Sequence, residues 1–143
     1  MKKLLSVLAV VGVVGAVMTA CRTVQAGDAA QKKDRVFELR TYVTHPGKLA
    51  DLHKRFRDHT CRLFQKHGID LIGFWVPTEK PACEDTLIYL VAFPSVEAQK
   101  KAWQAFRDDP DWKKVFAESH KNGIIVKEVK STTMTPVDYS PIR

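Results

Sequence analysis

Hydrophobic residues are distributed in two ways along this chain. Residues 4–20 form an almost continuous apolar run without a charged side chain, whereas from residue 35 onward apolar residues recur periodically among polar ones. No other apolar run approaches the ~20 residues that a helical membrane span requires. The pattern therefore predicts a terminal apolar segment followed by one folded domain of ordinary size.

Three segments have the pattern of strands. Residues 35–44 alternate strictly, which places Phe37, Leu39, Thr41 and Val43 on one face and Val36, Glu38, Arg40 and Tyr42 on the other. Residues 70–76 and 86–93 are apolar at both alternating positions, which predicts strands covered on both faces. A fourth strand is expected over residues 124–134.

Helical spacing and helix-end signals mark the segments between these strands. Residues 48–67 carry apolar positions at helical intervals, and Gly68 is suited to end that helix. Ser95 is a suitable N-cap for a second helix that ends near Asp108. Asp109 and Pro110 then start a third, short helix, which ends near Asn122-Gly123.

The resulting order is β-α-β-β-α-α-β, which predicts an α+β fold of the ferredoxin-like type: a four-stranded antiparallel sheet with the helices on one face. Such a layout leaves the other sheet face bare. Because the second and third strands are apolar on both faces, we expect that face to meet a second copy of the chain. The expected assembly is a homodimer with sheet facing sheet.

The apolar terminal segment has the order of an export signal. Lys2 and Lys3 precede the apolar run, and Ala20-Cys21 closes it, as in a bacterial lipoprotein signal whose cysteine is lipidated. Residues 1–20 are expected to be the signal peptide, and residues 21–34 the lipidated N-terminus and a flexible tether. Cleavage after Ala26 and retention of an uncleaved anchor are the alternatives. In a cell with two membranes, the periplasmic face of the outer membrane is the expected location.

Composition narrows the classes of function further. The 23 Lys and Arg residues against 16 Asp and Glu give a net charge of +7. They are spread through every element rather than gathered in a stripe, so no nucleic-acid partner is expected. Cys61 and Cys83 are either free or paired, and the sequence has no CxxC or CxxH pair that would suggest a metal site. No phosphate-binding loop or nucleophile elbow is present either.

Several short motifs together resemble the NIPSNAP family of the dimeric α/β-barrel superfamily. They are Phe37-Glu38-Leu39-Arg40-Thr41-Tyr42, Pro46-Gly47-Lys48-Leu49, Gly73-Phe74-Trp75, residues 106–112 (FRDDPDW) and the tail over residues 135–141 (TPVDYSP). The resemblance covers residues 35–141 and implies a dimeric α/β-barrel domain. For bacterial members it implies no assigned reaction, and related barrels that bind haem or act as cofactor-free oxygenases are an analogy of fold alone.

The first strand supplies one candidate site. Glu38, Arg40 and Tyr42 share a strand face, so they are expected to form a polar cluster within the barrel. There Arg40 would bind an anionic ligand and Tyr42 would donate a hydrogen bond. The structural alternative is an ion pair that fixes the register of the dimer.

Aromatic residues supply a second candidate site. Trp75 and Trp103, with Phe74, Phe106 and Trp112, are expected to line a ligand pocket between helices and sheet, although such residues more often form core. His53, His59 and His67 belong to the first helix. His53 and His67 are too far apart to share a metal ion, and any of the three is at most a single haem ligand. No cofactor is predicted.

These observations favour a membrane-tethered, homodimeric NIPSNAP-type module with a binding or stress-related role and a small apolar or anionic ligand. The alternative is a small cofactor-free oxygenase or haem-handling protein that uses the cavity between helices and sheet. The sequence does not decide whether the chain is an enzyme.

Overall fold

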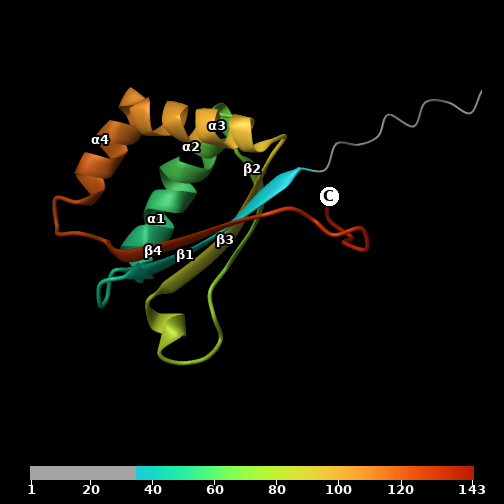
Figure 1. Cartoon of the computed structure of the whole chain (residues 1–143). Coiled ribbons are helices and arrows are strands. Elements are labelled where there is room, and N and C mark those ends of the chain that lie inside the picture. The colour runs from blue at the N-terminus through green and yellow to red at the C-terminus, as the bar shows by residue number, and fades with distance from the viewer. Residues whose placement is uncertain (1–34) are drawn as a thin grey trace, which may run out of the picture. The chain divides into compact units, whose positions relative to one another are not determined.

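The computed structural model describes residues 35–143 (Figure 1). The expected signal peptide, the lipidation site Cys21 and the tether lie outside these residues. The strands are β1 (Val36–Thr44), β2 (Asp70–Trp75), β3 (Thr86–Phe93) and β4 (Val126–Met134). The helices are α1 (Leu49–Arg55), η1 (Phe56–Thr60), α2 (Cys61–Lys66), η2 (Ala82–Glu84), α3 (Val96–Asp108) and α4 (Pro110–Ser119). Within residues 35–143, no helix is both long and apolar enough to cross a membrane.

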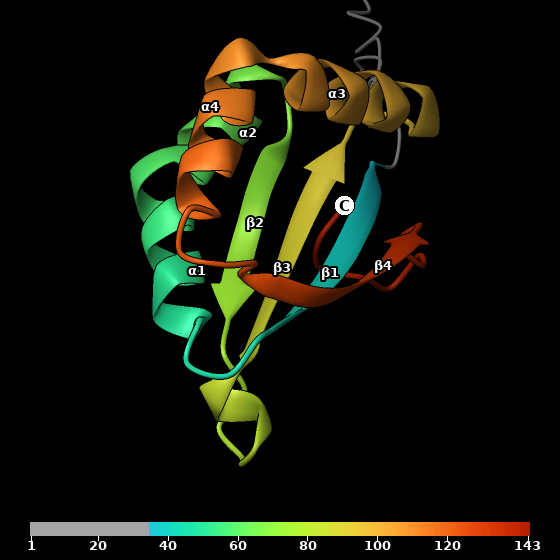
Figure 2. The ribbon, with the colours of Figure 1, turned by 90° about the vertical axis from the view of Figure 1, so that its left-hand side faces the viewer.

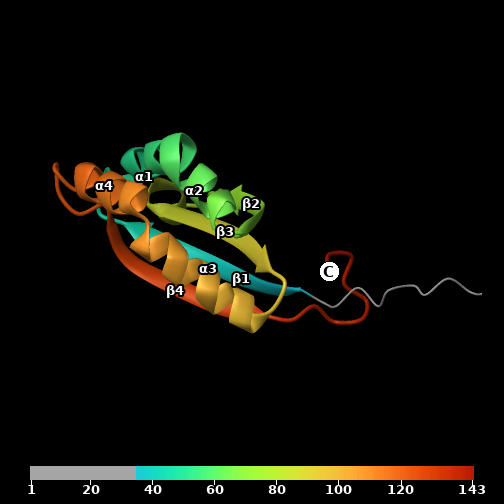
Figure 3. The ribbon, with the colours of Figure 1, turned by 90° about the horizontal axis from the view of Figure 1, so that it is seen from above.

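The four strands form one antiparallel sheet in the order β2-β3-β1-β4 (Figure 2). Seen from above, helices α1 to α4 all lie over the same side of that sheet (Figure 3). The prediction of a ferredoxin-like α+β fold is confirmed. The strand boundaries agree with the sequence pattern to within two residues.

Two helix starts follow the capping signals in the sequence. The Ser95 hydroxyl accepts a hydrogen bond from the backbone N–H of Ala98 at 3.1 Å, which fixes the first turn of α3. Asp109 accepts from the backbone N–H of Asp111 at 2.7 Å, and Pro110 occupies the first position of α4. Gly68 ends α2 with φ +72°, a conformation that side chains with a Cβ rarely adopt.

The first helical segment differs from the prediction in its centre. Residues 48–67 do not form one regular α-helix, because η1 between α1 and α2 is a π-helix of five residues. The Thr60 hydroxyl donates to the carbonyl of Arg55 at 3.2 Å and thereby closes this wider turn. π-Helical turns are rare and frequently occur at functional sites.

The core lies between the helices and the face of the sheet that they cover. On β3, Leu87, Tyr89, Val91 and Phe93 all point into it. Opposite them pack apolar side chains of the helices, among them Leu52, Leu63, Phe64, Trp103 and Phe106. Burying each such side chain stabilises the fold by about 1.5–3 kcal/mol relative to leaving it in water.

The sheet face away from the helices carries the more apolar side of β1. Leu39, Thr41 and Val43 lie there only half-buried, beside Ile88 and Leu90 of β3. We call this the uncovered face. The predicted polar cluster of Glu38, Arg40 and Tyr42 does not lie on the uncovered face. Those three side chains point toward the helices, where α3 supplies polar partners.

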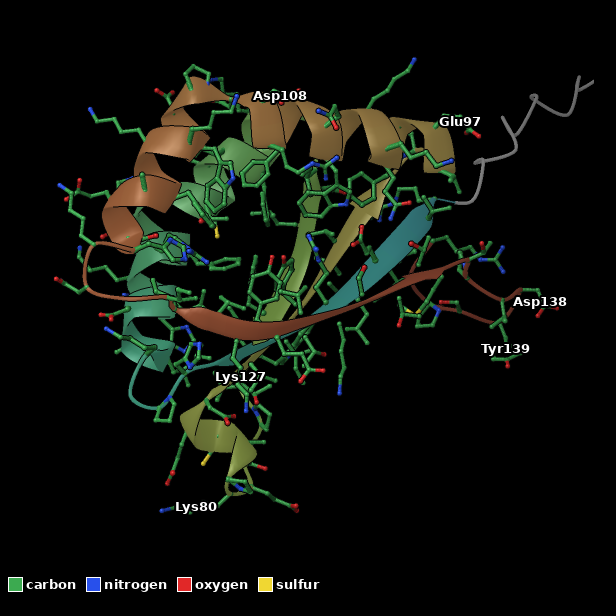
Figure 4. The ribbon with its side chains drawn as sticks, turned by 60° about the vertical axis from the view of Figure 1, so that its left-hand side comes forward. Lys80, Glu97, Asp108, Lys127, Asp138 and Tyr139 are labelled. Carbon is green, nitrogen blue, oxygen red and sulfur yellow. The ribbon has the colours of Figure 1, made fainter. Side chains whose placement is uncertain are left out.

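Trp75 also belongs to the uncovered face. It pairs with Ile88 in the sheet, is 52% exposed, and lays its ring over Gly73. A Cβ at residue 73 would lie 2.5 Å from the Trp75 ring, so a side chain there would displace this ring. The segment after β4 turns back, and Arg35 Nε donates to the carbonyl oxygen of Arg143 at 3.1 Å. Within that segment, Asp138 and Tyr139 point away from the sheet (Figure 4).

Candidate functional site

A cavity of about 280 Å³ lies between the helices and the sheet. We call it the inner cavity. Its walls come from β1, from the first helical segment, from α3 and α4, and from β4 and the residues just before it. Six aromatic rings line it: Tyr42, Phe56, Phe64, Phe106, Trp112 and Phe116. Aromatic walls of this kind suit a ligand with an apolar or aromatic body.

Only a few polar groups reach the inner cavity. Arg55 is the last residue of α1, Thr60 closes the π-helical turn, and His120 follows α4. The His120 Nδ1 lies 2.7 Å from the carbonyl oxygen of Phe116, where its N–H donates, and the imidazole packs 4.1 Å from the Phe116 ring. An apolar cavity with a few placed polar groups is the usual form of a small-molecule site.

A second, larger hollow lies between α1–η1 and α4, with a volume of about 540 Å³. We call it the outer cleft. In contrast to the inner cavity, most of the residues that line it are charged. They include the acids Asp51, Asp58, Asp111 and Glu118, and the bases Lys54, Arg55, Arg62 and Lys114. Arg55 lines both hollows and so stands at their common wall.

Glu38 is the centre of a buried polar network under α3. Its carboxylate is 4% exposed and accepts hydrogen bonds from Gln99 Nε2 at 2.6 Å and from Trp103 Nε1 at 2.5 Å. Ser131 of β4 donates to the other carboxylate oxygen at 2.5 Å. These donors explain how a carboxylate can be buried without a large penalty.

Arg40 completes this network. Its Nε forms an ion pair with Glu38 Oε1 at 3.4 Å, although like the Nε of Arg55 it makes no hydrogen bond, and its guanidinium stacks 4.5 Å above the Trp103 ring. Burial alone would lower the pKa of Arg40, but the neighbouring Tyr42, Tyr89 and Glu38 together raise it above its ordinary value. Two arrangements were possible for Glu38, Arg40 and Tyr42, an anion-binding cluster or an ion pair. The structure contains an ion pair, between Glu38 and Arg40. That pair fixes the sheet against α3 and does not face the uncovered side.

Arg55 has the opposite surroundings. It is 5% exposed, and its nearest polar side-chain contact is the Ser119 hydroxyl, which its Nη1 reaches at 3.3 Å. Its guanidinium lies 5.5 Å from the Trp112 ring and 5.9 Å from the Phe116 ring. Burial lowers the pKa of Arg55, and the nearby phenols of Tyr42 and Tyr89 offset only part of that effect.

No acid compensates the Arg55 charge within the part of the chain that the structure describes. None of the ion pairs there, counted to 4.0 Å between nitrogen and oxygen, includes Arg55. Its Nε is buried and makes no hydrogen bond. The sequence analysis did not single out Arg55, because an arginine three residues after Leu52 has no feature that separates it from Lys54 or Arg57.

The predicted aromatic pocket is only partly assembled. Phe106 and Trp112 line the inner cavity, and Trp103 lies beside it in the core, packed 5.2 Å from the Phe64 ring. The structure does not bring Trp75 to this place, because the strand alternation turns its side chain to the uncovered face. Trp75 and Trp103 therefore cannot line one pocket within a single chain.

The three histidines of the first helical segment do not line the inner cavity. His59 lines the outer cleft. His67 Nε2 donates to Asp109 Oδ2 at 2.6 Å, and Lys66 Nζ reaches the same oxygen at 2.8 Å. This contact joins the end of α2 to the start of α4. His67 therefore has a structural role.

The residues that the structure describes contain neither a disulfide nor a metal site. Cys61 and Cys83 are both free, one at the start of α2 and the other in η2. Among residues 35–143, no group of three or more His, Cys, Asp or Glu side chains could hold a metal ion. The candidate ligand-binding features of the described domain are thus the two hollows and the arginine between them.

A four-stranded antiparallel sheet with helices on one face, enclosing a cavity between the two layers, defines a ferredoxin-like α+β domain. The NIPSNAP family model matches residues 37–141, which is most of the chain, and the protein belongs to that family. Among proteins whose functions are curated, none matches this chain in sequence.

Solved structures share this fold at low sequence identity. A NIPSNAP family protein of unknown function from Agrobacterium tumefaciens is 19% identical, with a TM-score of 0.67 over 78% of this chain and 96% of its own. A NIPSNAP-like domain protein from Burkholderia xenovorans is 15% identical, with a TM-score of 0.66 over 76% of this chain and 90% of its own. SnoaB, a cofactor-independent oxygenase from Streptomyces nogalater, is 13% identical, with a TM-score of 0.51 over 76% and 98%.

Proposed function

We propose that this NIPSNAP domain is a binding module that encloses a small aromatic or apolar molecule in the inner cavity. The observation that carries the proposal is the set of six aromatic rings around about 280 Å³ of space. An apolar cavity of about 150 Å³ is already sufficient to bind benzene. The inner cavity therefore has room for a ligand with one or two fused rings.

Titration calorimetry of the full-length chain with 2-naphthamide, a neutral two-ring probe, tests this proposal. Val129 of β4 lines the cavity and is partly exposed, so Val129→Phe should fill the space from its open side without disturbing the core. We expect saturable one-site binding by the native chain and at least a tenfold loss in Val129→Phe. Lys127→Phe, on the same strand but outside the cavity wall, is the matched control and should bind as the native chain does (Figure 4). Equal binding by all three chains would refute the inner cavity as the site.

The module is proposed to act as a homodimer through the uncovered face. Leu39 and Ile88 lie there half-buried, and Trp75 is more exposed still, which is unfavourable for an isolated domain. A two-fold arrangement would place the same apolar residues of two chains against each other. Sedimentation equilibrium should give the mass of a dimer for the native chain and of a monomer for Leu90→Lys. A monomeric native chain at micromolar concentration would contradict the proposal.

We also propose that a lipid on Cys21 tethers the chain to a membrane. The proposed location is the periplasmic face of an outer membrane. The support is the order of basic, apolar and small residues before Cys21 in the sequence. Growth of cells with a labelled fatty acid should label the native chain and leave Cys21→Ala unlabelled. Unchanged labelling of the variant would exclude lipidation at this residue.

One observation favours a second candidate, a cofactor-free oxygenase: the chain shares its fold with SnoaB. Fold alone does not carry an activity across such distance. An oxygen-electrode assay over a panel of polyphenols separates the candidates, because a binding module consumes no oxygen. Saturable uptake that Val129→Phe abolishes would favour the enzyme. For a haem-handling role, the predicted ligands His53, His59 and His67 lie outside the inner cavity, and His120 is the histidine among its lining residues.

A further inference from the structure

The uncompensated charge of Arg55 indicates more about the ligand than the aromatic walls do. A buried charge without a counter-charge is unfavourable, because it loses its hydration and gains nothing comparable. Arginine cannot escape this by losing its proton at neutral pH. A protein that keeps such a group at a cavity wall is suited to an anionic partner that arrives from solution.

The acids closest to Arg55 are already engaged by other residues. Each of the four acids of the outer cleft is paired with a lysine. The pairs are Asp51 with Lys48 at 3.1 Å, Asp58 with Lys54 at 2.5 Å, Asp111 with Lys66 at 3.6 Å and Glu118 with Lys121 at 2.6 Å. None of these carboxylates turns to Arg55. The lack of a partner for Arg55 is thus a property of the packing and not of a shortage of acids.

The contacts of Arg55 hold its guanidinium in place while leaving donors free. The rings of Trp112 and Phe116 pack within 6 Å of it, and Ser119 accepts from Nη1 at 3.3 Å. Its Nε, buried and unbonded, remains a donor. A planar guanidinium with free N–H groups matches a carboxylate or phosphate in a two-point contact.

Arg55 lies between the two hollows, so one ligand could contact it and also fill the inner cavity. Its side chain lines the aromatic inner cavity on one side and the charged outer cleft on the other. Within the described residues, Arg62 and Lys114 of the outer cleft also have no ion-pair partner, so they add positive potential at its mouth.

We propose that the ligand of this domain is a small organic acid: its ring system occupies the inner cavity and its carboxylate binds Arg55. This inference rests on the proposed function and adds the charge and the orientation of the ligand. The carboxylate would take the place of the missing counter-ion and satisfy the buried Nε. The ring would replace water against the aromatic walls.

Titration calorimetry with two matched probes tests the inference on the full-length chain. The probes are 2-naphthoate and its neutral amide, 2-naphthamide, which share a ring system and differ in charge. We expect the native chain to bind 2-naphthoate at least tenfold more tightly than the amide. Arg55→Met should remove this preference and leave amide binding within about twofold of the native value, since a buried ion-pair contact is worth more than a factor of ten. Arg55→Lys should keep part of the preference.

The control variant is Arg62→Met, which removes an exposed base of the same cleft and should keep most of the preference. If the native chain binds both probes equally, or if Arg62→Met loses the preference and Arg55→Met keeps it, the inference is wrong while the inner cavity stands. If neither probe binds, the proposed function fails first. Inorganic phosphate tests whether free anions bind at Arg55. If phosphate binds the chain but displaces 2-naphthoate only at concentrations far above its own Kd, the anion site lies elsewhere and the inference is wrong.

Discussion

Two arginines of this domain lie on the same side of the sheet and have opposite surroundings. Arg40 of β1 faces the carboxylate of Glu38, which three further donors hold in place. Arg55 of α1 faces aromatic rings and a single hydroxyl, with no acid within ion-pair distance in the described domain. The pKa of Arg40 is raised and that of Arg55 is lowered; both lose hydration and lie near Tyr42 and Tyr89, but only Arg40 also has Glu38 and a side-chain hydrogen bond with Tyr89.

The difference shows how a buried charge indicates its role. A charge whose partners all belong to the chain is part of the structure, and its removal leaves the partner without compensation. A charge without a partner contributes little to the fold and is available to a ligand. The same residue type, at similar burial, therefore has a structural role in one place and a proposed binding role in the other.

The largest effect is expected from Arg40→Met. This change leaves Glu38 buried without its positive partner, and breaking a buried pair in this way destabilises a domain by about 3 kcal/mol. Urea unfolding of the native and variant chains measures the difference. In the double variant Glu38→Gln/Arg40→Met most of the loss should be recovered, because no buried charge then remains in this network. A loss below about 0.5 kcal/mol in Arg40→Met would mean that the two arginines do not differ.

A second paired cluster predicts how the domain responds to acid. Hydrogen bonds from Lys66, and then from His67, hold the pKa of Asp109 well below its usual range. A carboxyl with a lowered pKa stabilises the fold above its unfolded pKa of about 4, and this contribution is lost as the pH falls below that value. Thermal unfolding between pH 6 and pH 3 should show a falling Tm. Asp109→Asn, which keeps the N-cap oxygen, should start lower at pH 6 and fall less steeply.

Arg55→Met is the contrasting variant in the same experiment. Because Arg55 makes no ion pair, its removal should leave the slope of Tm against pH unchanged. A flattened slope in Arg55→Met would indicate that an acid compensates Arg55 after all.

A smaller effect is expected at the π-helical turn that presents Arg55. The hydroxyl of Thr60 is buried and donates to the Arg55 carbonyl, so the isosteric change Thr60→Val removes this side-chain hydrogen bond. Loss of one such hydrogen bond destabilises by about 1 kcal/mol. Urea unfolding measures the loss, and 2-naphthoate binding should weaken with it while 2-naphthamide binding changes less. An equal loss for both probes would show that Thr60 shapes the cavity and does not position the guanidinium.

Much of the fold could be predicted from the sequence, because the determining signals are local. The alternation over residues 35–44 and the caps Ser95 and Asp109 act within a few residues of themselves, and each element they mark is present. The same alternation correctly separates the two faces of β1. It does not state which face the helices cover, and the more apolar face is the uncovered one.

The candidate site could be predicted less well, because it depends on contacts between distant segments. Asp51, Asp58 and Glu118 pair with lysines three or four residues away, as helical spacing predicts. Spacing does not show that Trp112, Phe116 and Ser119 pack against Arg55, because these contacts join α1 to the distant α4. The π-helical turn also shifts the phase of the helix after Arg55, so an ideal helical wheel misplaces the residues that follow. Residue type alone groups Trp75 with Trp103, whereas the sheet alternation places Trp75 on the other face.

The smallest effect on stability is expected from Arg55→Met in the absence of ligand. Methionine removes a buried charge and keeps an apolar side chain of similar length, a type of change that is often neutral or stabilising. The loss of contacts with the Trp112 and Phe116 rings, each worth about 0.5–1 kcal/mol, opposes this gain. The free energy of unfolding should therefore stay within about 1 kcal/mol of the native value. At a 2-naphthoate concentration of 100 Kd the native chain should gain about 2.7 kcal/mol, and Arg55→Met much less. If Arg55→Met is instead as destabilising as Arg40→Met, then Arg55 is a structural residue and the contrast between the two arginines, with the ligand charge inferred from it, does not hold.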